Sequence, residues 1–154
     1  MTDPTVTYDN SSSYDIAETV AFTCTAADDG GSGIATHDCA DVNGTGWEFY
    51  PDASFEATAE DNAGNTFTGS TSFDVTVSFD GTCTLVRLWV AQRGVANSLC
   101  VKINAAQRSD ARGRTRARDG SLNAFINEVE AQSGKKVPAD KAPLLISFAR
   151  SLMN

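Results

Sequence analysis

The residues best suited to chemistry lie in two short acidic segments. The segment "DDGGSG" begins with Asp28 and Asp29, and the segment "EDNAGN" contains Asp61, Asn62 and Asn65. Their oxygens could bind calcium, which takes about six to eight oxygen ligands at flexible spacing. The same residue types also form tight turns, in which Asp and Asn bind nearby backbone amides and Gly takes positive φ angles. No EF-hand register is present, so we favour turns and expect no cofactor, with calcium as the alternative.

His37 is the only histidine in the sequence. In a catalytic triad it would need a nucleophile and an orienting carboxylate in one pocket, and the candidates Ser32 and Asp38 are simply its neighbours in sequence. A strand residue that faces solvent or the rim of the fold is the favoured interpretation. We therefore assign no catalytic residue and expect that the chain is not an enzyme.

The segment "GWEFYP" places Trp47, Phe49 and Tyr50 close together. Exposed aromatic side chains can stack on sugar rings, because they combine a large apolar face with a polar edge. A small fold also needs large side chains at its edge, and Trp47 alternates with Phe49 as core residues do. We favour core filling for Trp47 and Phe49, and Tyr50 is the best candidate for an exposed ligand contact.

A dense group of arginines flanks Gly113. Its members are Arg108, Arg112, Arg114, Arg116 and Arg118. Such density suggests nucleic acid as a partner. The acidic first half of the chain would repel a phosphate backbone, however, and no aromatic residues interleave with the arginines, so we expect no nucleic acid. A solvated helix corner, or a surface for an anionic polymer with Arg112, Arg114 and Arg116 as candidate contacts, is favoured.

Four cysteines form one pair in each half of the chain. Cys24 and Cys39 are 15 residues apart, and Cys83 and Cys100 are 17 apart, with no spacing suited to zinc. Three pairings are open, and only the within-half pairing crosslinks each small domain to itself, which would stabilise each by about 3 kcal/mol. This pairing favours a secreted or extracellular protein over reduced thiols in the cytosol. The second bridge would need an oblique helix crossing if the helices turn at Gly94.

Charge divides the chain near residue 80. Residues 1–80 carry fifteen acidic residues and no Lys or Arg, whereas residues 81–154 hold all twelve basic residues and five acidic ones. The net charges are therefore about −15 and +7. No stretch approaches the roughly 18 apolar residues of a membrane span. We expect a monomer of two domains with the boundary near residue 80 and no membrane span.

Hydrophobic periodicity predicts different folds for the two halves. In residues 1–80 apolar residues alternate with polar ones, as in "STSFDVTVSFD" with Phe73, Val75, Val77 and Phe79. Together with "PTVTYD", "ETVAFTCTAADD", "IATHDCADV", "GWEFY" and "SFEATAEDN" this predicts about six strands, typical of a small all-β sandwich. If the sandwich is immunoglobulin-like, the two acidic loops lie at the same end.

Residues 81–154 show helical spacing. Apolar residues three and four apart occur in four groups, three of which are followed by Gly94, Gly113 and Gly134, where helix C-terminal caps belong. The pattern predicts a small all-α module of four helices, in which Pro143 delays or bends the last helix.

The first half resembles bacterial immunoglobulin-like repeats related to the hyalin-repeat type. The resemblance rests on "CTAADDGGSGIATHDC" followed by "FEATAEDNAGNTFTGSTSFDVTV" and covers most of residues 4–79. It pairs a "D-x-GSGI" loop with an "A-x-DNAGN" turn and has a cysteine on each side of the first motif. The resemblance implies an immunoglobulin-like sandwich over residues 1–80.

The second half resembles the small FIMAH helical module. The resemblance rests on "LVRLWVAQRGVANSLCVKINAA" and "LNAFINEVEAQSGKKVPADKAPLLISFARSL", over about residues 82–152. Such modules occur mostly at the C-terminal end of large secreted bacterial enzymes and surface proteins. The two resemblances imply a non-catalytic accessory region that spaces, stabilises or attaches an upstream catalytic or adhesive domain. The alternative is a module that binds a polysaccharide or a cell-surface ligand.

Overall fold

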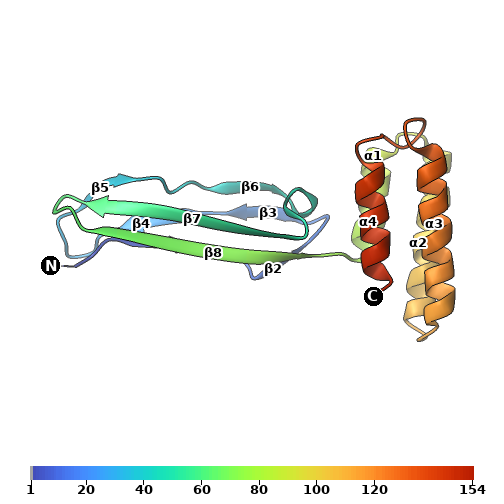
Figure 1. Ribbon diagram of the computed structural model, residues 1–154, viewed down its shortest axis with the longest axis horizontal. Coiled ribbons are helices and arrows are strands. Elements are labelled where there is room, and N and C mark those ends of the chain that lie inside the picture. Colours follow the sequence, from blue (N-terminus) through green and yellow to red (C-terminus); the bar gives the residue numbers. More distant parts are fainter. Residues whose placement is uncertain (1) are drawn as a thin grey trace. The chain divides into compact units, whose positions relative to one another are not determined.

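The structure is a computed structural model that describes residues 2–154 (Figure 1). The chain divides into two compact units, one ending at Thr76 and one running from Val77 to Asn154. We call them the strand unit and the helical unit and describe each by itself. The boundary lies a few residues before the position expected from composition.

The described part of the strand unit contains eight strands and one 3₁₀ helix. These are β1 (Thr5–Tyr8), β2 (Ser13–Asp15), β3 (Thr19–Phe22), β4 (Cys24–Ala27), β5 (Ile34–His37), β6 (Val42–Thr45), η1 (Gly46–Phe49), β7 (Asp52–Asp61) and β8 (Thr66–Thr76).

Strands β7 and β8 form the long antiparallel hairpin on which the strand unit is built. Four strands make one sheet in the order β2-β8-β7-β5, with β2 parallel to β8. Two shorter ladders, β1-β4 and β3-β6, are antiparallel. These ladders cover one face of the four-stranded sheet, so the unit has two layers (Figure 1).

Alternation explains which face of the hairpin is covered. Phe73 and Val75 of β8 are buried, and Asp74 between them is exposed. Phe22 of β3 lies with its ring centre 5.8 Å from that of Phe73, and Val6 of β1 clusters with Ala57 of β7. Apolar side chains from both layers therefore meet in one core, while the other face carries Ser, Thr and acidic residues.

Three sequence predictions for residues 1–80 were wrong in detail. The segment "IATHDCADV" forms two strands, β5 and β6, which pair with different partners. The segment "GWEFY" forms the 3₁₀ helix η1, in which the Glu48 carboxylate accepts the Thr45 amide at 2.6 Å. Phe79 is helical, because the Ser78 hydroxyl accepts the Gly81 amide at 2.8 Å and starts a helix where alternation predicts strand.

The helical unit contains four helices, as the spacing predicts. They are α1 (Phe79–Trp89), α2 (Arg93–Asp110), α3 (Thr115–Gln132) and α4 (Ala142–Leu152). Helix α2 packs against α1 and α3, and α4 packs against α3 and α1. The core between them includes the fully buried side chains of Leu85, Leu99, Ile103, Leu122, Phe125, Leu145 and Phe148.

Two of the three glycines that were predicted to mark helix ends do so. Gly113 and Gly134 have φ angles of 67° and 74°, which suit the end of a helix. Gly94 instead lies in the first turn of α2, because the preceding turn is Val90–Gln92. Pro143 is also in a first turn, that of α4, where its missing amide breaks no hydrogen bond.

The disulfides are the within-half pairs, Cys24–Cys39 and Cys83–Cys100. Cys83 lies six residues before the end of α1, and Cys100 lies seven residues after the start of α2. The two cysteines are therefore level in the antiparallel pair. The expected oblique crossing followed from placing the turn at Gly94 and is not needed.

Close backbone packing makes Gly46 a sensitive position. The Gly46 amide donates to the Glu18 carbonyl at 2.8 Å, and a Cβ on Gly46 would lie 2.0 Å from the backbone oxygen of Asp15. Gly120 in α3 is the opposite case, since a Cβ there meets nothing within 4 Å.

We predict that Gly46→Ala destabilises the strand unit by about 2 kcal/mol or more, because the backbone must move to admit the methyl group. Gly120→Ala serves as the open-space counterpart and is expected to stabilise the helical unit by about 0.5–1 kcal/mol, because Ala has the higher helix propensity. NMR-monitored thermal unfolding would follow each unit separately. An unchanged melting temperature for Gly46→Ala would show that the contact is not tight.

Candidate functional site

The two acidic segments lie side by side in the strand unit, as expected. The β4–β5 loop and the β7–β8 turn are joined by hydrogen bonds from the turn to the loop. The Asn62 amide N–H donates to the Gly33 carbonyl at 2.9 Å, and its side-chain Nδ2 donates to the Ser32 carbonyl at 2.9 Å. The Ala63 amide donates to the Ser32 hydroxyl at 3.0 Å. One polar cluster therefore forms from residues about 30 positions apart.

Asp61 organises the β7–β8 turn. It is only 1% exposed, and Oδ1 accepts the amides of Ala63 and Asn65 at 2.9 and 2.8 Å, while Oδ2 accepts Nδ2 of Asn65 at 2.8 Å. The pKa of Asp61 is lowered, first by the Asn65 side chain and then by the backbone amides, although burial opposes the shift. Both carboxylate oxygens thus hold the turn in shape.

The other predicted calcium ligands also take part in local contacts. Asp28 Oδ2 accepts the Gly33 amide at 2.8 Å, and Asp28 Oδ1 accepts the Thr2 hydroxyl at 3.3 Å. Asp29 is exposed and receives a hydrogen bond from Thr2 at its backbone carbonyl. Within residues 2–154 no group of three or more His, Cys, Asp or Glu residues could hold a metal ion. The contacts are those that the turn interpretation predicts.

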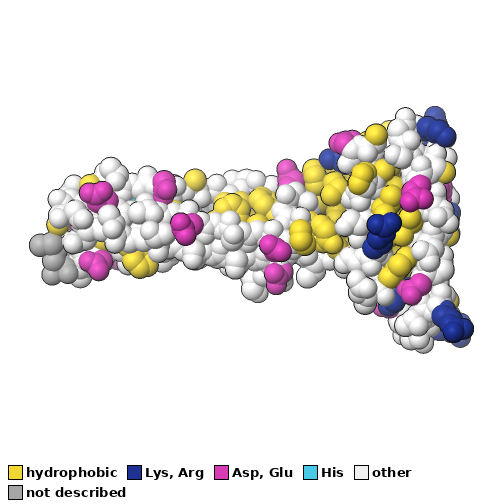
Figure 2. All heavy atoms as spheres, viewed as in Figure 1, with side chains coloured by type: hydrophobic (Ala, Val, Ile, Leu, Met, Phe, Trp, Pro, Cys, Tyr) yellow, Lys and Arg dark blue, Asp and Glu magenta, His cyan; other side chains and the backbone are white. Residues whose placement is uncertain are grey.

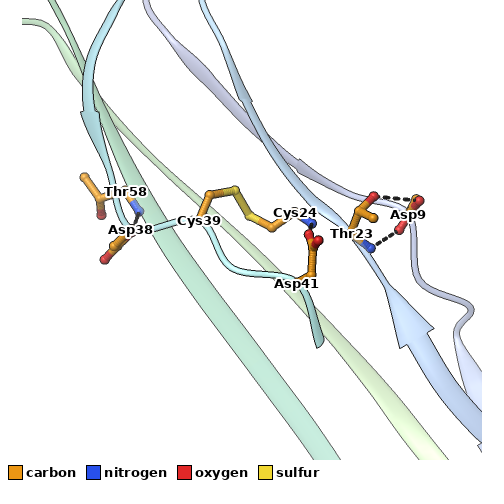
Figure 3. Close-up of a disulfide and its surroundings, with 7 residues drawn as sticks. All are labelled: Asp9, Thr23, Cys24, Asp38, Cys39, Asp41 and Thr58. Carbon is orange, nitrogen blue, oxygen red and sulfur yellow. Dashed lines mark hydrogen bonds between the residues drawn. A yellow bond between two sulfur atoms is a disulfide. The ribbon is translucent and has the colours of Figure 1, made fainter. Parts of the chain in front are cut away.

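A second polar cluster surrounds the Cys24–Cys39 disulfide (Figure 3). Asp9 accepts the Thr23 amide at 2.6 Å and its hydroxyl at 2.8 Å. Asp41 accepts the Cys24 amide at 3.1 Å, and Asp38 accepts the Thr58 amide at 2.6 Å. The disulfide therefore lies among carboxylates that bind backbone amides of neighbouring segments.

The backbone and hydroxyl of Thr23 lower the pKa of Asp9, in that order of importance. Sequence analysis did not single out Asp9 or Asp41. The only signal for them was the excess of acidic residues without basic partners in the first half of the chain.

His37 is exposed at the end of β5, on the rim of the sheet. It lines a shallow pocket of about 340 Å³ with Asp38, Glu60 and three threonines. The Asp38 carboxylate binds the Thr58 amide, and the Ser32 hydroxyl accepts the Ala63 amide. Asp38 and Ser32 therefore have structural partners of their own, and the arrangement is not that of a triad.

The aromatic segment contributes to the core of the strand unit. Phe49 lies with its ring centre 5.6 Å from that of Phe73 and 6.1 Å from that of Phe55. Trp47 is half-buried, and so is Tyr50, which was expected to be exposed. The short 3₁₀ helix turns this segment back onto the core, so Tyr50 offers less surface to a ligand than an extended strand would.

The arginines near Gly113 divide into two kinds. Arg112 and Arg114 are exposed in the turn between α2 and α3, and Arg116 is exposed in the first turn of α3. Arg118 is buried, forms ion pairs with Asp119 at 2.8 Å and Asp110 at 3.0 Å, and donates to the Met153 carbonyl. Arg118 therefore ties the end of the chain to α2 and α3 and belongs to the core of the helical unit.

The helical unit also has a pocket that sequence analysis missed. It has a volume of about 390 Å³ and lies where α1 turns into α2, lined by Arg87, Val90, Ala91, Arg93, Ala96 and Asn97. A signal for it was present, since residues 81–109 contain no Asp or Glu but include four basic residues. Lys and Arg side chains gather on the helical unit, and acidic side chains are spread over the strand unit (Figure 2).

Comparisons with protein-family models, with curated proteins and with solved structures returned no match. No helix formed by residues 2–154 has the length and apolar character needed to span a bilayer.

We predict that acid weakens the strand unit through Asp61 and Asp9. Both have folded pKa values below the unfolded value of about 3.9, so the stability they contribute is complete above that value and is lost as the pH falls through the folded values. Asp61→Asn should lower the melting temperature of the strand unit at neutral pH, because an amide cannot accept all three hydrogen bonds. The deficit should shrink in acid.

Asp29→Asn is the matched control, because it removes the same charge from an exposed neighbouring carboxylate. It should leave the melting temperature nearly unchanged. We also expect calcium to have no effect on melting. A calcium-dependent rise that disappears in Asp61→Asn would contradict the turn interpretation.

We predict that native-state reduction opens Cys24–Cys39 before Cys83–Cys100. The first pair is half-buried, whereas Cys83 and Cys100 are 8% and 1% exposed. Removing either bridge as a double Ala variant should cost about 2–4 kcal/mol in its own unit. Differential alkylation followed by peptide mass spectrometry gives the order of opening, and simultaneous opening at low reductant would contradict it.

Proposed function

We propose that the chain is a non-catalytic accessory region of a secreted bacterial protein or enzyme, where it acts as a spacer, stabilising or attachment module. One observation carries the proposal: two small successive units each have a buried core and a disulfide of their own. Disulfides of this kind persist in oxidising compartments and stabilise domains too small for a large core. These disulfides support an extracellular location, which is part of the proposal.

Strand pairing supports the immunoglobulin-like interpretation of the strand unit. Strands β5, β7 and β8 are neighbours in the order that strands C, F and G have in such a sandwich. Ladders β1-β4 and β3-β6 supply the pairs expected of strands A, B and E in the opposite layer. The presence of four helices in residues 77–154 supports the FIMAH-like interpretation of the helical unit.

The proposed partner is a catalytic or adhesive domain upstream in a longer chain, and the proposed state is a monomer without cofactor or nucleic acid. The hydrogen-bonding of Asp28, Asp61 and Asn62 supports a structural role for the acidic loops. Residues of the type used in catalysis, such as Ser32 and Asp38, likewise bind backbone amides.

A module that binds a polysaccharide or a cell-surface ligand is the second candidate. It is favoured by the exposure of Arg112, Arg114 and Arg116 at one helix corner. A polysaccharide pull-down that loses its signal in Arg114→Ala, and keeps it in Arg150→Ala, where the arginine is also exposed, would favour this candidate. Tyr50→Ala tests the half-buried aromatic contact in the same assay.

The accessory role predicts that the purified chain has no turnover and that fusing it to a secreted polysaccharide hydrolase leaves kcat on a soluble substrate within about two-fold. The reason is that a spacer or attachment module does not touch the reacting atoms. Steady-state kinetics of the hydrolase with and without the chain measures this. Hydrolysis by the chain alone that is lost in His37→Ala would overturn the proposal.

A further inference from the structure

Arg87 and Arg93 face the same pocket from two successive helices. Arg87 lies in the last turn of α1, and Arg93 is the first residue of α2, so the short turn Val90–Gln92 brings both to one place. Both residues are exposed. Across residues 2–154 neither guanidinium forms an ion pair or a side-chain hydrogen bond, in contrast to Arg118 with its two carboxylate partners.

The pocket is lined by three apolar residues and three polar ones. Val90 and Ala96 are only 2% and 4% exposed, Ala91 is exposed, and Asn97 adds one amide beside the two guanidiniums. A volume of about 390 Å³ lies within the range of small-ligand sites, which are mostly apolar with a few placed polar groups. The pocket therefore has room for a ring-shaped group that carries charge at one side.

The charge around the pocket selects for an anion. No acidic residue occurs from position 81 to position 109, so no carboxylate of α1 beyond its first turn, or of α2 before its last residue, competes for the two guanidiniums. Lys102, the other basic residue near the middle of α2, is already paired with Glu128 at 2.6 Å. Arg87 and Arg93 are free to bind a ligand from solution.

The ligand class follows from these features together. A planar guanidinium binds a carboxylate through two parallel hydrogen bonds, and two of them can hold one carboxylate from both sides. The exposed methyl group of Ala91 offers a small apolar contact for the face of a sugar ring, and the Asn97 amide suits a hydroxyl group. An acidic peptide lacks this combination of a flat ring and hydroxyl groups.

We propose that the pocket between α1 and α2 binds a uronic acid residue of an anionic polysaccharide, with Arg87 and Arg93 on the carboxylate and Asn97 on a ring hydroxyl. The inference rests on the attachment role proposed above, to which it gives a ligand. It differs from the second candidate function in its location, because it uses neither Tyr50 nor the arginine corner at residues 112–116.

Titration calorimetry with polygalacturonate tests the proposal on the full chain. Binding should weaken by about ten-fold or more in Arg87→Gln/Arg93→Gln, because the charge and the paired hydrogen bonds of both guanidiniums are lost while a polar side chain remains. The matched control is Arg108→Gln/Arg150→Gln, which removes the same charge from exposed arginines outside both the pocket and the arginine corner, and it should change affinity less than two-fold. All four arginines are exposed, so both variants should fold, which circular dichroism checks.

Two further polymers test whether binding depends on the negative charge and on the carboxylate group in particular. Methyl-esterified polygalacturonate has the same rings without charge and should bind at least about ten-fold more weakly. Dextran sulfate offers a different anion; tighter binding of dextran sulfate than of polygalacturonate would overturn the carboxylate assignment. Equal losses in the two double variants would show general charge attraction and would also overturn the proposal. Absence of binding to every polymer would reject the pocket but leave the spacer role intact.

Discussion

The strand unit depends on how its backbone amides are satisfied where two segments change their pairing partners. Along residues 19–27 the chain pairs first with β6 and then with β1, and along residues 34–45 it pairs first with β7 and then with β3. Regular ladders cannot continue through these changes, so the backbone amides there need acceptors other than the carbonyls of a neighbouring strand. The Cys24–Cys39 bridge and the carboxylates of Asp9, Asp38 and Asp41 lie at this point (Figure 3).

The acidic residues of the strand unit supply acceptors for backbone amides. A unit without Lys or Arg cannot form side-chain ion pairs of its own, yet Asp9, Asp28 and Asp61 each bind backbone amides instead. A carboxylate is a strong acceptor for a backbone N–H, and such bonds lower the pKa of Asp9 and of Asp61. The helical unit instead joins its helices with ion pairs between side chains, such as that of Lys102 in α2 with Glu128 in α3. The two halves therefore stabilise themselves by different uses of charge.

Sequence patterns predicted the features that depend on neighbouring residues. Alternation identified the β7–β8 hairpin, helical spacing identified four helices, and Gly113 and Gly134 marked helix ends. The sequence also indicated that the two acidic loops meet. It did not reveal the interruptions at Thr23 and at residues 38–41, because alternation continues through them and the responsible hydrogen bonds join residues 14 or more positions apart.

The pocket between α1 and α2 was missed for a related reason. Its turn contains no Gly or Pro, so Gly94 was taken as the helix end and Arg93 was not recognised as the start of α2. In the structure the turn is Val90–Gln92, so Arg93 lies in the same pocket as Arg87, and Cys83 lies at the same height along the helix pair as Cys100. The same three residues therefore determine two features: they align the cysteines for the disulfide, and they bring Arg87 and Arg93 to one pocket.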